Sequence, residues 1–285
     1  MPPAPDPVLL ALDFGGTKTA LTVADPHGRR LRDLTVETAA EQGAHAALKR
    51  AVDAARTLLD GREPQAVGVA TIGIPGAEGV ALAPNISGWA ELALGRELAL
   101  AFPESELCLA TDVKAAARFE HAHGALAGCD PGLYVNLGTG LAVALVTGGT
   151  VVAGRHGASG EIGYNLRSVR DVGRPSADRT LLEEAVSGKA LARAAGEAPQ
   201  LGPHSAEFID ELAFHLVNLT IAVDPERIVV GGGMVRSWDA LHDRLRAALD
   251  AAVPYPPSLV PAAHPYDAPL LGALALAVEA ARTST

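Results

Sequence analysis

Apolar runs that end in glycine turns alternate along this chain with segments whose apolar positions have helical spacing. The turn Phe14-Gly-Gly-Thr-Lys18 separates two apolar runs, and residues 30–36 form a third, which predicts three consecutive strands. Within residues 46–59 the apolar positions recur every three or four residues, as on one face of a helix. Residues 66–72 form another apolar run. The beginning of the chain therefore predicts the order strand, strand, strand, helix, strand.

The same strand–turn–strand pattern recurs in the second half of the chain. Residues 133–137 form an apolar run that ends in Gly138-Thr-Gly140, and a further apolar run follows. Asp13 and Asn136 hold the same place in the two copies, as Gly15 and Gly138 do. A repeated unit of this kind predicts two related lobes, each with its own glycine turn.

The remaining patterns are those of helices and one further strand. Strand 227–230 ends in the turn Gly231-Gly-Gly233. Helical spacing predicts helices over residues 179–186, 205–223, 238–251 and 269–281. We therefore expect an α/β protein of two lobes.

The composition and net charge of the chain argue against several classes of function. Hydrophobic residues make up 48% of the 285 residues and aromatic residues only 4%, which predicts a core of Ala, Val, Leu and Ile. The net charge of −10 argues against nucleic acid and anionic membranes as partners. Residues 132–154 carry no charge, but their glycines favour a β-hairpin over a membrane span. Two cysteines and the lack of a signal-peptide pattern predict a cytoplasmic protein.

Each of the three glycine turns follows an apolar strand. Glycine lets backbone N–H groups approach an anion closely, as in phosphate-binding turns, although any one of these turns could be a tight turn and no more. Three of them, two related by the repeat, favour a nucleotide site. The chain has no Gly-x-x-x-x-Gly-Lys-Ser/Thr sequence, and Gly138-Thr-Gly140 leads into a strand, which argues against a P-loop and a dinucleotide fold. A two-lobed phosphotransferase remains.

On these residues the chain resembles the ROK family of sugar kinases and repressors, within the actin-like ATPase superfamily. The three turns resemble the family's two phosphate loops and its adenosine motif. The segments that resemble the lining of the family's hexose pocket are Gly73–Gly76, Ala83–Trp89, Gly157–Gly163 and Leu182–Gly188. The resemblance implies two lobes of ribonuclease H-like fold with a cleft between them. We expect residues 1–110 to form the small lobe, completed by a C-terminal helix within 269–285, and residues 111–268 to form the large lobe.

The resemblance also implies ATP and Mg²⁺ as cofactors. Asp13, at the end of the first strand, would hold Mg²⁺ through water; its local alternative is a turn-forming role. The residues implied to bind ATP are Asp13, Gly15, Gly16, Thr17, Lys18, Gly138, Thr139, Gly140, Gly231, Gly232 and Gly233.

A predicted Ala-rich helix begins at Thr111-Asp112. By local sequence Asp112 is a helix N-cap, while the resemblance implies that it takes the proton of a hexose hydroxyl, O6, and the two roles can coexist. The residues implied to bind sugar are Gly76, Asn85, Thr111, Asp112, Glu161, Tyr164 and Glu183. By composition alone Glu183 could be a solvated helix charge and Asn85 a turn residue, and we expect Trp89 to be a packing anchor.

Two departures from the family pattern change the expectations. Thr111 stands where Asn is usual, and Tyr164 stands where many members have a zinc-binding His. The loop 165–179 has no Cys, although the family's zinc loop is Cys-rich. We therefore predict no zinc site, with the Tyr164 hydroxyl offered to the sugar instead.

The resemblance leaves several functions open. The first is an ATP-dependent hexokinase of glucokinase type, and the alternatives within enzymes are a kinase for another hexose or an N-acetylhexosamine, or one that also uses polyphosphate. The alternative outside enzymes is a non-catalytic sugar-binding or regulatory protein. The family-level expectation for assembly is a homodimer.

Overall fold

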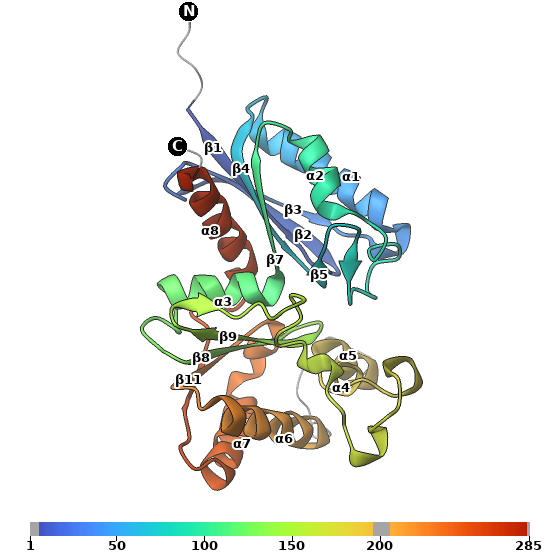
Figure 1. The fold of residues 1–285 in the computed structure, drawn as a ribbon, viewed down its shortest axis with the longest axis vertical. Coiled ribbons are helices and arrows are strands. Elements are labelled where there is room, and N and C mark those ends of the chain that lie inside the picture. The colour runs from blue at the N-terminus through green and yellow to red at the C-terminus, as the bar shows by residue number, and fades with distance from the viewer. Residues whose placement is uncertain (1–5, 196–205, 284–285) are drawn as a thin grey trace, which may run out of the picture. The chain divides into compact units, whose positions relative to one another are not determined.

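The computed structural model describes residues 6–195 and 206–283 of the chain. The chain folds into two compact units (Figure 1). The first unit comprises Met1–Phe119 and Asp267–Thr285, and the second comprises Glu120–Tyr266. The boundary between the units therefore falls within the helix Asp112–His123 and again directly before the C-terminal helix Ala268–Thr283.

A five-stranded sheet in the order β3-β2-β1-β4-β7 forms the centre of the first unit. The central strand β1 pairs antiparallel with β2 and parallel with β4, and β4 pairs parallel with β7. The strands are β1 (Val8–Phe14), β2 (Lys18–Ala24), β3 (Arg30–Glu37), β4 (Pro64–Thr71) and β7 (Glu106–Thr111). A short hairpin of β5 (Ile74–Pro75) and β6 (Val80–Ala81) follows β4.

Helices cover both faces of this sheet, so β1 is apolar on both sides. Leu10 and Leu12 pack with α1 (Ala44–Leu59) and α2 (Leu94–Ala101), while Leu9 and Ala11 pack with α8 (Ala268–Thr283). Figure 1 shows α8 on the opposite face from α1 and α2. A Cβ on Gly68 would lie 1.8 Å from the carbonyl oxygen of Ala273, so glycine is what allows α8 to pack this closely.

The second unit repeats the strand order of the first. Its sheet has the order β10-β9-β8-β11-β12, in which the central strand β8 again pairs antiparallel with the next strand and parallel with the fourth. The strands are β8 (Gly132–Leu137), β9 (Leu141–Thr147), β10 (Thr150–Val151), β11 (Arg227–Gly231) and β12 (Ser258–Pro261). The repeat detected in the sequence therefore corresponds to a repeated sheet, and the predicted α/β fold is confirmed.

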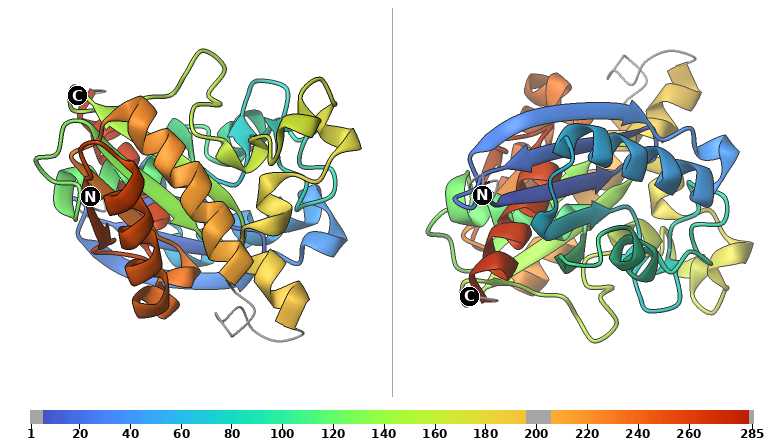
Figure 2. Two further views of the ribbon diagram at one scale, coloured as in Figure 1. Left: turned by 90° about the horizontal axis from the view of Figure 1, so that it is seen from below. Right: turned by 90° about the horizontal axis from the view of Figure 1, so that it is seen from above.

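Long helices pack on the sheet of the second unit. Apolar side chains of α6 (Ala206–Val223) and α7 (Trp238–Ala252) share one buried cluster with those of β8 and β11, and Figures 1 and 2 show the two helices side by side. The shorter helices are α4 (Leu182–Ala185) and α5 (Gly188–Ala195), with single-turn segments at Ile162–Tyr164, Val169–Asp171, Ser176–Asp178 and Gly233–Ser237.

The prediction of a helix over residues 179–186 was wrong in its extent. The Glu184 side chain accepts a hydrogen bond from the Leu181 backbone N–H at 2.8 Å, which starts α4 at Leu182, and Val186 has already left helical geometry. Helix α3 (Asp112–His123) begins where the sequence predicts it. Position 205, the predicted start of α6, lies outside the described residues.

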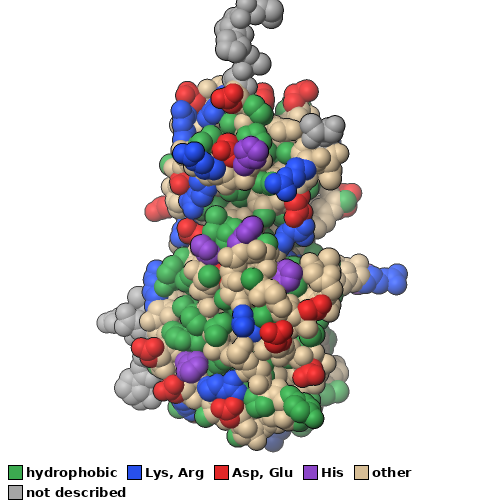
Figure 3. Space-filling model, turned by 90° about the vertical axis from the view of Figure 1, so that its left-hand side faces the viewer, with side chains coloured by type: hydrophobic (Ala, Val, Ile, Leu, Met, Phe, Trp, Pro, Cys, Tyr) green, Lys and Arg blue, Asp and Glu red, His purple; other side chains and the backbone are tan. Residues whose placement is uncertain are grey.

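The distribution of surface charge and the hydropathy of the helices bear on possible partners. On the face drawn in Figure 3, basic and acidic side chains are interspersed and do not gather into areas of one sign. Within residues 6–195 and 206–283, no helix combines the length and the apolar character that a membrane crossing requires.

Candidate functional site

Two candidate carboxylates follow parallel strands of the first unit. Asp13 on β1 is in register with Ala70 on β4, which is in register with Ala110 on β7, and Asp112 follows that strand directly. Since parallel strands end at the same edge of a sheet, both carboxylates lie at the carboxyl edge, where open α/β sheets bind their ligands.

Electrostatics couples these two groups. Asp13 is a half-buried residue of β1. Removal of its carboxyl from water, followed by the negative charge of Asp112, raises the pKa of this group from 3.8 to about 7, although the charge of Lys18 lowers it. Asp267, which precedes α8, also raises this pKa. Sequence reasoning missed Asp267; the signal that could have found it is an acidic residue directly before the predicted C-terminal helix.

Asp112 is held by the start of α3. The Val113 N–H donates to Asp112 Oδ1 at 2.8 Å, and the Lys114 N–H donates to the buried Thr111 hydroxyl oxygen at 3.3 Å. Thr111 therefore supplies the N-cap hydrogen bond of this helix, and Asp112 binds the first N–H of the same turn. The predicted capping role is shared by the two residues.

The first glycine turn is a tight backbone structure with Asn85 beside it. Gly15 N–H donates to the Lys18 carbonyl at 3.0 Å, and the Thr38 hydroxyl donates to the Gly15 carbonyl at 2.7 Å. A Cβ on Gly16 would lie 3.8 Å from the Asn85 Cβ. The predicted sugar residue Asn85 thus lies next to the predicted phosphate turn.

Gly76, a predicted sugar residue, and Trp89, a predicted packing anchor, both lie in the first unit. The Gly76 N–H donates to the Gly79 carbonyl at 2.8 Å in the turn of the β5–β6 hairpin. Trp89 is fully buried, its ring lies 5.4 Å from that of Phe14, and its indole N–H donates to the Thr71 hydroxyl at 3.3 Å. The predicted packing role of Trp89 is confirmed.

The second and third glycine turns lie next to each other in the second unit. Strands β8 and β11 are parallel, with Asn136 in register with Gly231. A Cβ on Gly232, where φ is +87°, would lie 2.6 Å from the Leu137 carbonyl oxygen and 2.7 Å from Asn136 Oδ1. Gly138 accepts a hydrogen bond from the Gly188 N–H at 2.7 Å. Two glycine-rich backbones therefore meet at the carboxyl edge of this sheet.

Glu183 lies against the second glycine turn. Its Oε2 accepts a hydrogen bond from the Leu141 N–H at 3.1 Å, and a Cβ on Gly140 would lie 2.4 Å from the same oxygen. The side chain is half-buried, so the alternative of a solvated helix charge was wrong. A side chain at position 140 would therefore require the Glu183 carboxylate to move.

Tyr164 and Glu161 are near Glu183 in the same unit. Tyr164 ends a single-turn helix, and its N–H donates to the Glu161 carbonyl at 3.1 Å. Burial, followed by the charges of Glu183 and then Glu161, raises the pKa of the Tyr164 phenol. The three predicted sugar residues of the second unit therefore share one acidic environment, in which the phenol stays protonated and can donate a hydrogen bond.

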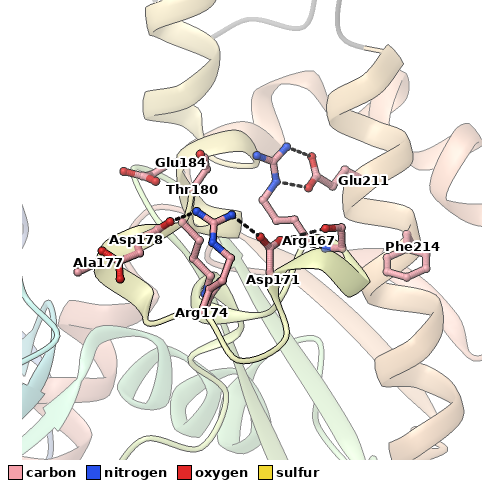
Figure 4. Close-up of a pocket in the computed structure, with 11 residues that line it drawn as sticks. Arg167, Asp171, Arg174, Ala177, Asp178, Thr180, Glu184, Glu211 and Phe214 are labelled. Atoms are coloured by element: carbon pink, nitrogen blue, oxygen red, sulfur yellow. Dashed lines mark hydrogen bonds and ion pairs between the residues drawn. The ribbon is translucent and has the colours of Figure 1, made fainter.

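A cavity of about 880 Å³ opens elsewhere on the second unit (Figure 4). Arg167 makes a two-pronged ion pair with Glu211 at 2.5 and 2.9 Å, and Arg174 pairs with Asp171 at 3.3 Å. None of the predicted site residues lines this cavity. Across the described part of the chain, no group of three or more His, Cys, Asp and Glu side chains is placed to hold a metal ion.

Comparison with known proteins gives matches that extend over both units. The family model described as "ROK family" matches residues 9–280. A glucokinase of Thermotoga maritima is 26% identical over 84% of this chain and 86% of its own length. A kanosamine kinase of Amycolatopsis mediterranei is 29% identical over 80% of each chain. The crystal structure of a ROK family glucokinase from Streptomyces griseus, in complex with glucose and AMPPNP, is 26% identical with a TM-score of 0.78 over 95% of this chain and 99% of that one.

Proposed function

The chain belongs to the ROK family, and on that premise we propose that it is an ATP-dependent sugar kinase that phosphorylates a glucose-type hexose at O6. The observation that carries this proposal is the coupled pair Asp13 and Asp112 at the carboxyl edge of the first sheet, beside a glycine turn. The relatives named glucokinase and the neighbour with bound glucose and AMPPNP support it.

Asp112 is the general base of the proposed reaction. As the sugar O6 attacks the γ-phosphate, Asp112 accepts the hydroxyl proton, so that the attacking oxygen carries more negative charge. The hydrogen bond from Val113 N–H fixes one carboxylate oxygen and so orients the group. Because the proton acceptor is held by backbone at the start of a helix, little reorganisation is needed when the sugar arrives.

Asp13 fits a magnesium ion. Mg²⁺ prefers carboxylate and phosphate oxygens and retains several waters. Burial is the largest cause of the raised pKa of Asp13, and the charges of Asp112 and Asp267 raise it further while Lys18 lowers it. A divalent cation at this edge would favour the ionised carboxylate. When bound, the ion neutralises charge on the β- and γ-phosphates. Asp13 holds it through water in this proposal.

We propose that the glycine turns bind ATP and that the predicted sugar residues bind the hexose. In this proposal the first turn, with Gly15, Gly16, Thr17 and Lys18, and the paired second and third turns lie against the phosphates, because glycine backbone permits a close approach. The N–H groups of Gly15, Gly138 and Gly232 donate to carbonyls of Lys18, Gly140 and Pro265, which fixes the shape of the turns. The residues proposed to bind sugar are Gly76, Asn85, Thr111 and Asp112 in the first unit and Glu161, Tyr164 and Glu183 in the second. Carboxylates accept from sugar hydroxyls, and the Tyr164 phenol donates.

An aminohexose is the second substrate candidate, favoured by the kanosamine kinase relative at 29% identity. Glu161, Tyr164 and Glu183 form an acidic environment that also suits an ammonium group on the sugar. The homodimer and the cytoplasmic location stay predictions.

The test is ADP release from MgATP with a panel of hexoses, aminohexoses and N-acetylhexosamines, with and without EDTA, and with polyphosphate in place of ATP. We expect turnover that depends on both sugar and Mg²⁺. Absence of turnover across the panel, together with sugar-dependent thermal stabilisation, would contradict the kinase and indicate a sugar-binding regulator.

A further inference from the structure

One arginine side chain connects two segments of the second unit that each carry a proposed sugar-binding residue. Arg179 donates from one guanidinium nitrogen to the Tyr164 carbonyl at 2.6 Å and from another to the Asn165 carbonyl at 3.1 Å. These carbonyls end the single-turn helix Ile162–Tyr164, where backbone acceptors have no helical partner. A planar guanidinium suits two adjacent acceptors, which a single ammonium group would not bind in the same way.

The two hydrogen bonds to the Tyr164 and Asn165 carbonyls hold the Arg179 guanidinium in place. The side chain is half-buried, and its Nε is buried with no hydrogen-bond partner among the described residues. Since an unpaired buried donor is unfavourable, the two bonds to Tyr164 and Asn165 must outweigh that cost.

Further ion pairs fix the loop from which Arg179 projects. Arg174 pairs with Asp171 and donates to the carbonyl of Asp178, the residue before Arg179 (Figure 4). Arg167 ties the beginning of the loop to Glu211 of α6. These interactions fix the backbone next to Arg179. The hydrogen bonds from its side chain therefore hold the Tyr164 backbone in a defined position.

Arg179 lies three residues before Leu182, the first residue of α4. Glu183 stands in the first turn of that helix and is fixed by the hydrogen bond from Leu141 N–H. A Cβ on Gly163, the residue before Tyr164, would lie 3.1 Å from the Glu183 Cβ, so the Tyr164 segment and Glu183 are close together. The effect of the Glu183 charge on the pKa of the Tyr164 phenol agrees with this. Arg179 thus links the backbone of Tyr164 to the segment that places Glu183.

We propose that Arg179 is a positioning residue for sugar binding, which sets the placement of Tyr164 relative to Glu183 and thereby the KM for the sugar. This inference rests on the proposed sugar-kinase function. Arg179 itself touches neither sugar nor ATP in this account. Its loss therefore weakens ground-state binding of the sugar and leaves the chemical step intact once sugar is saturating.

The test compares Arg179→Met and Arg179→Lys with Arg170→Met, an exposed arginine of the same loop as matched control. We expect the sugar KM to rise about tenfold or more in Arg179→Met and by an intermediate factor in Arg179→Lys. The kcat at saturating sugar and the KM for ATP stay within about twofold, as do all constants of Arg170→Met. Should Arg179→Met fail to fold, Arg179→Lys decides alone.

A double-mutant cycle with Tyr164→Phe separates positioning from general loss of structure. If Arg179 acts through Tyr164, the sugar KM of the double variant matches that of the worse single variant and not the product of the two effects. Fully multiplicative effects, an unchanged sugar KM in Arg179→Met, or a fall in kcat without a change in KM would each overturn the inference. A wild-type protein that neither phosphorylates nor binds any sugar overturns the proposed function instead, whatever the variants do.

Discussion

The two sheets of this protein have the same strand order, yet the residue at the end of their central strands differs in charge. Asp13 is the last residue but one of β1, and Asn136 is the last residue but one of β8. The carboxyl of Asp13 couples to Asp112 and has a pKa of about 7, whereas the neutral amide of Asn136 lies against the glycine turns at Gly138 and Gly232. At this position one copy of the scaffold therefore places an ionisable carboxyl and the other places a neutral amide beside glycine backbone.

This difference is consistent with different proposed roles for the two copies: proton transfer and cation binding in the first, and phosphate binding in the second. A proton acceptor and a cation site need negative charge, while phosphate binding needs its absence.

Replacing Asp112 with Asn should lower kcat by a factor of about 10² to 10⁴, because the amide cannot accept the hydroxyl proton. The amide oxygen can still accept from Val113 N–H, so folding and sugar binding should persist. Steady-state kinetics and calorimetric sugar binding measure the two effects. Near-normal turnover would remove Asp112 from its proposed role.

Replacing Asn136 with Asp should raise the KM for ATP about tenfold, since it places a negative charge beside the second and third glycine turns, which we propose to bind phosphate. The sugar KM should stay within about twofold. Asn136→Ser, which removes the amide without adding charge, is the control. An unchanged KM for ATP would break the comparison between the two copies.

The glycine turns should differ in their tolerance of a side chain. Gly232→Ala should reduce stability by about 1–3 kcal/mol because φ is +87° and the new Cβ would meet the Leu137 carbonyl oxygen. Gly16→Ala, whose Cβ would find its nearest neighbour at 3.8 Å, should cost less than about 1 kcal/mol. Thermal unfolding of both variants checks this, and equal losses would argue against it.

The metal-free protein should lose stability as pH rises through the pKa of Asp13. Because folding raises this pKa from 3.8 to about 7, the protonated form favours the folded state. The stabilising contribution is complete below about pH 4 and is lost as pH passes about 7. Compared with Asp13→Asn, the wild-type Tm should therefore fall as pH rises, and Mg²⁺ should restore it. Parallel Tm curves with and without Mg²⁺ would contradict the prediction.

The repeat and its turns could be predicted because they are local in sequence. Each glycine turn follows an apolar run directly, and two similar units imply two similar sheets. Trp89 was likewise recognisable as a packing anchor. The turns depend on neighbouring residues, which a single sequence displays, while the packing role of Trp89 was predicted from its residue type alone.

Contacts between distant segments could not be predicted in the same way. The hydrogen bond from Leu141 N–H to Glu183 joins positions far apart, so composition alone left Glu183 open to a solvated role. The two carbonyls bound by Arg179 lie in an irregular loop with no periodic pattern. The effect of Asp267 on Asp13 depends on the return of the chain to the first unit.

The most direct test measures sugar- and Mg²⁺-dependent ADP release by the wild-type, Asp112→Asn and Asn136→Asp proteins side by side, with sugar and ATP both saturating. The account predicts turnover by the wild type, a loss of about 10²-fold or more for Asp112→Asn, and near-wild-type kcat for Asn136→Asp. Wild-type turnover by Asp112→Asn, or an equal loss in both variants, would contradict the assignment of the chemistry to the first unit.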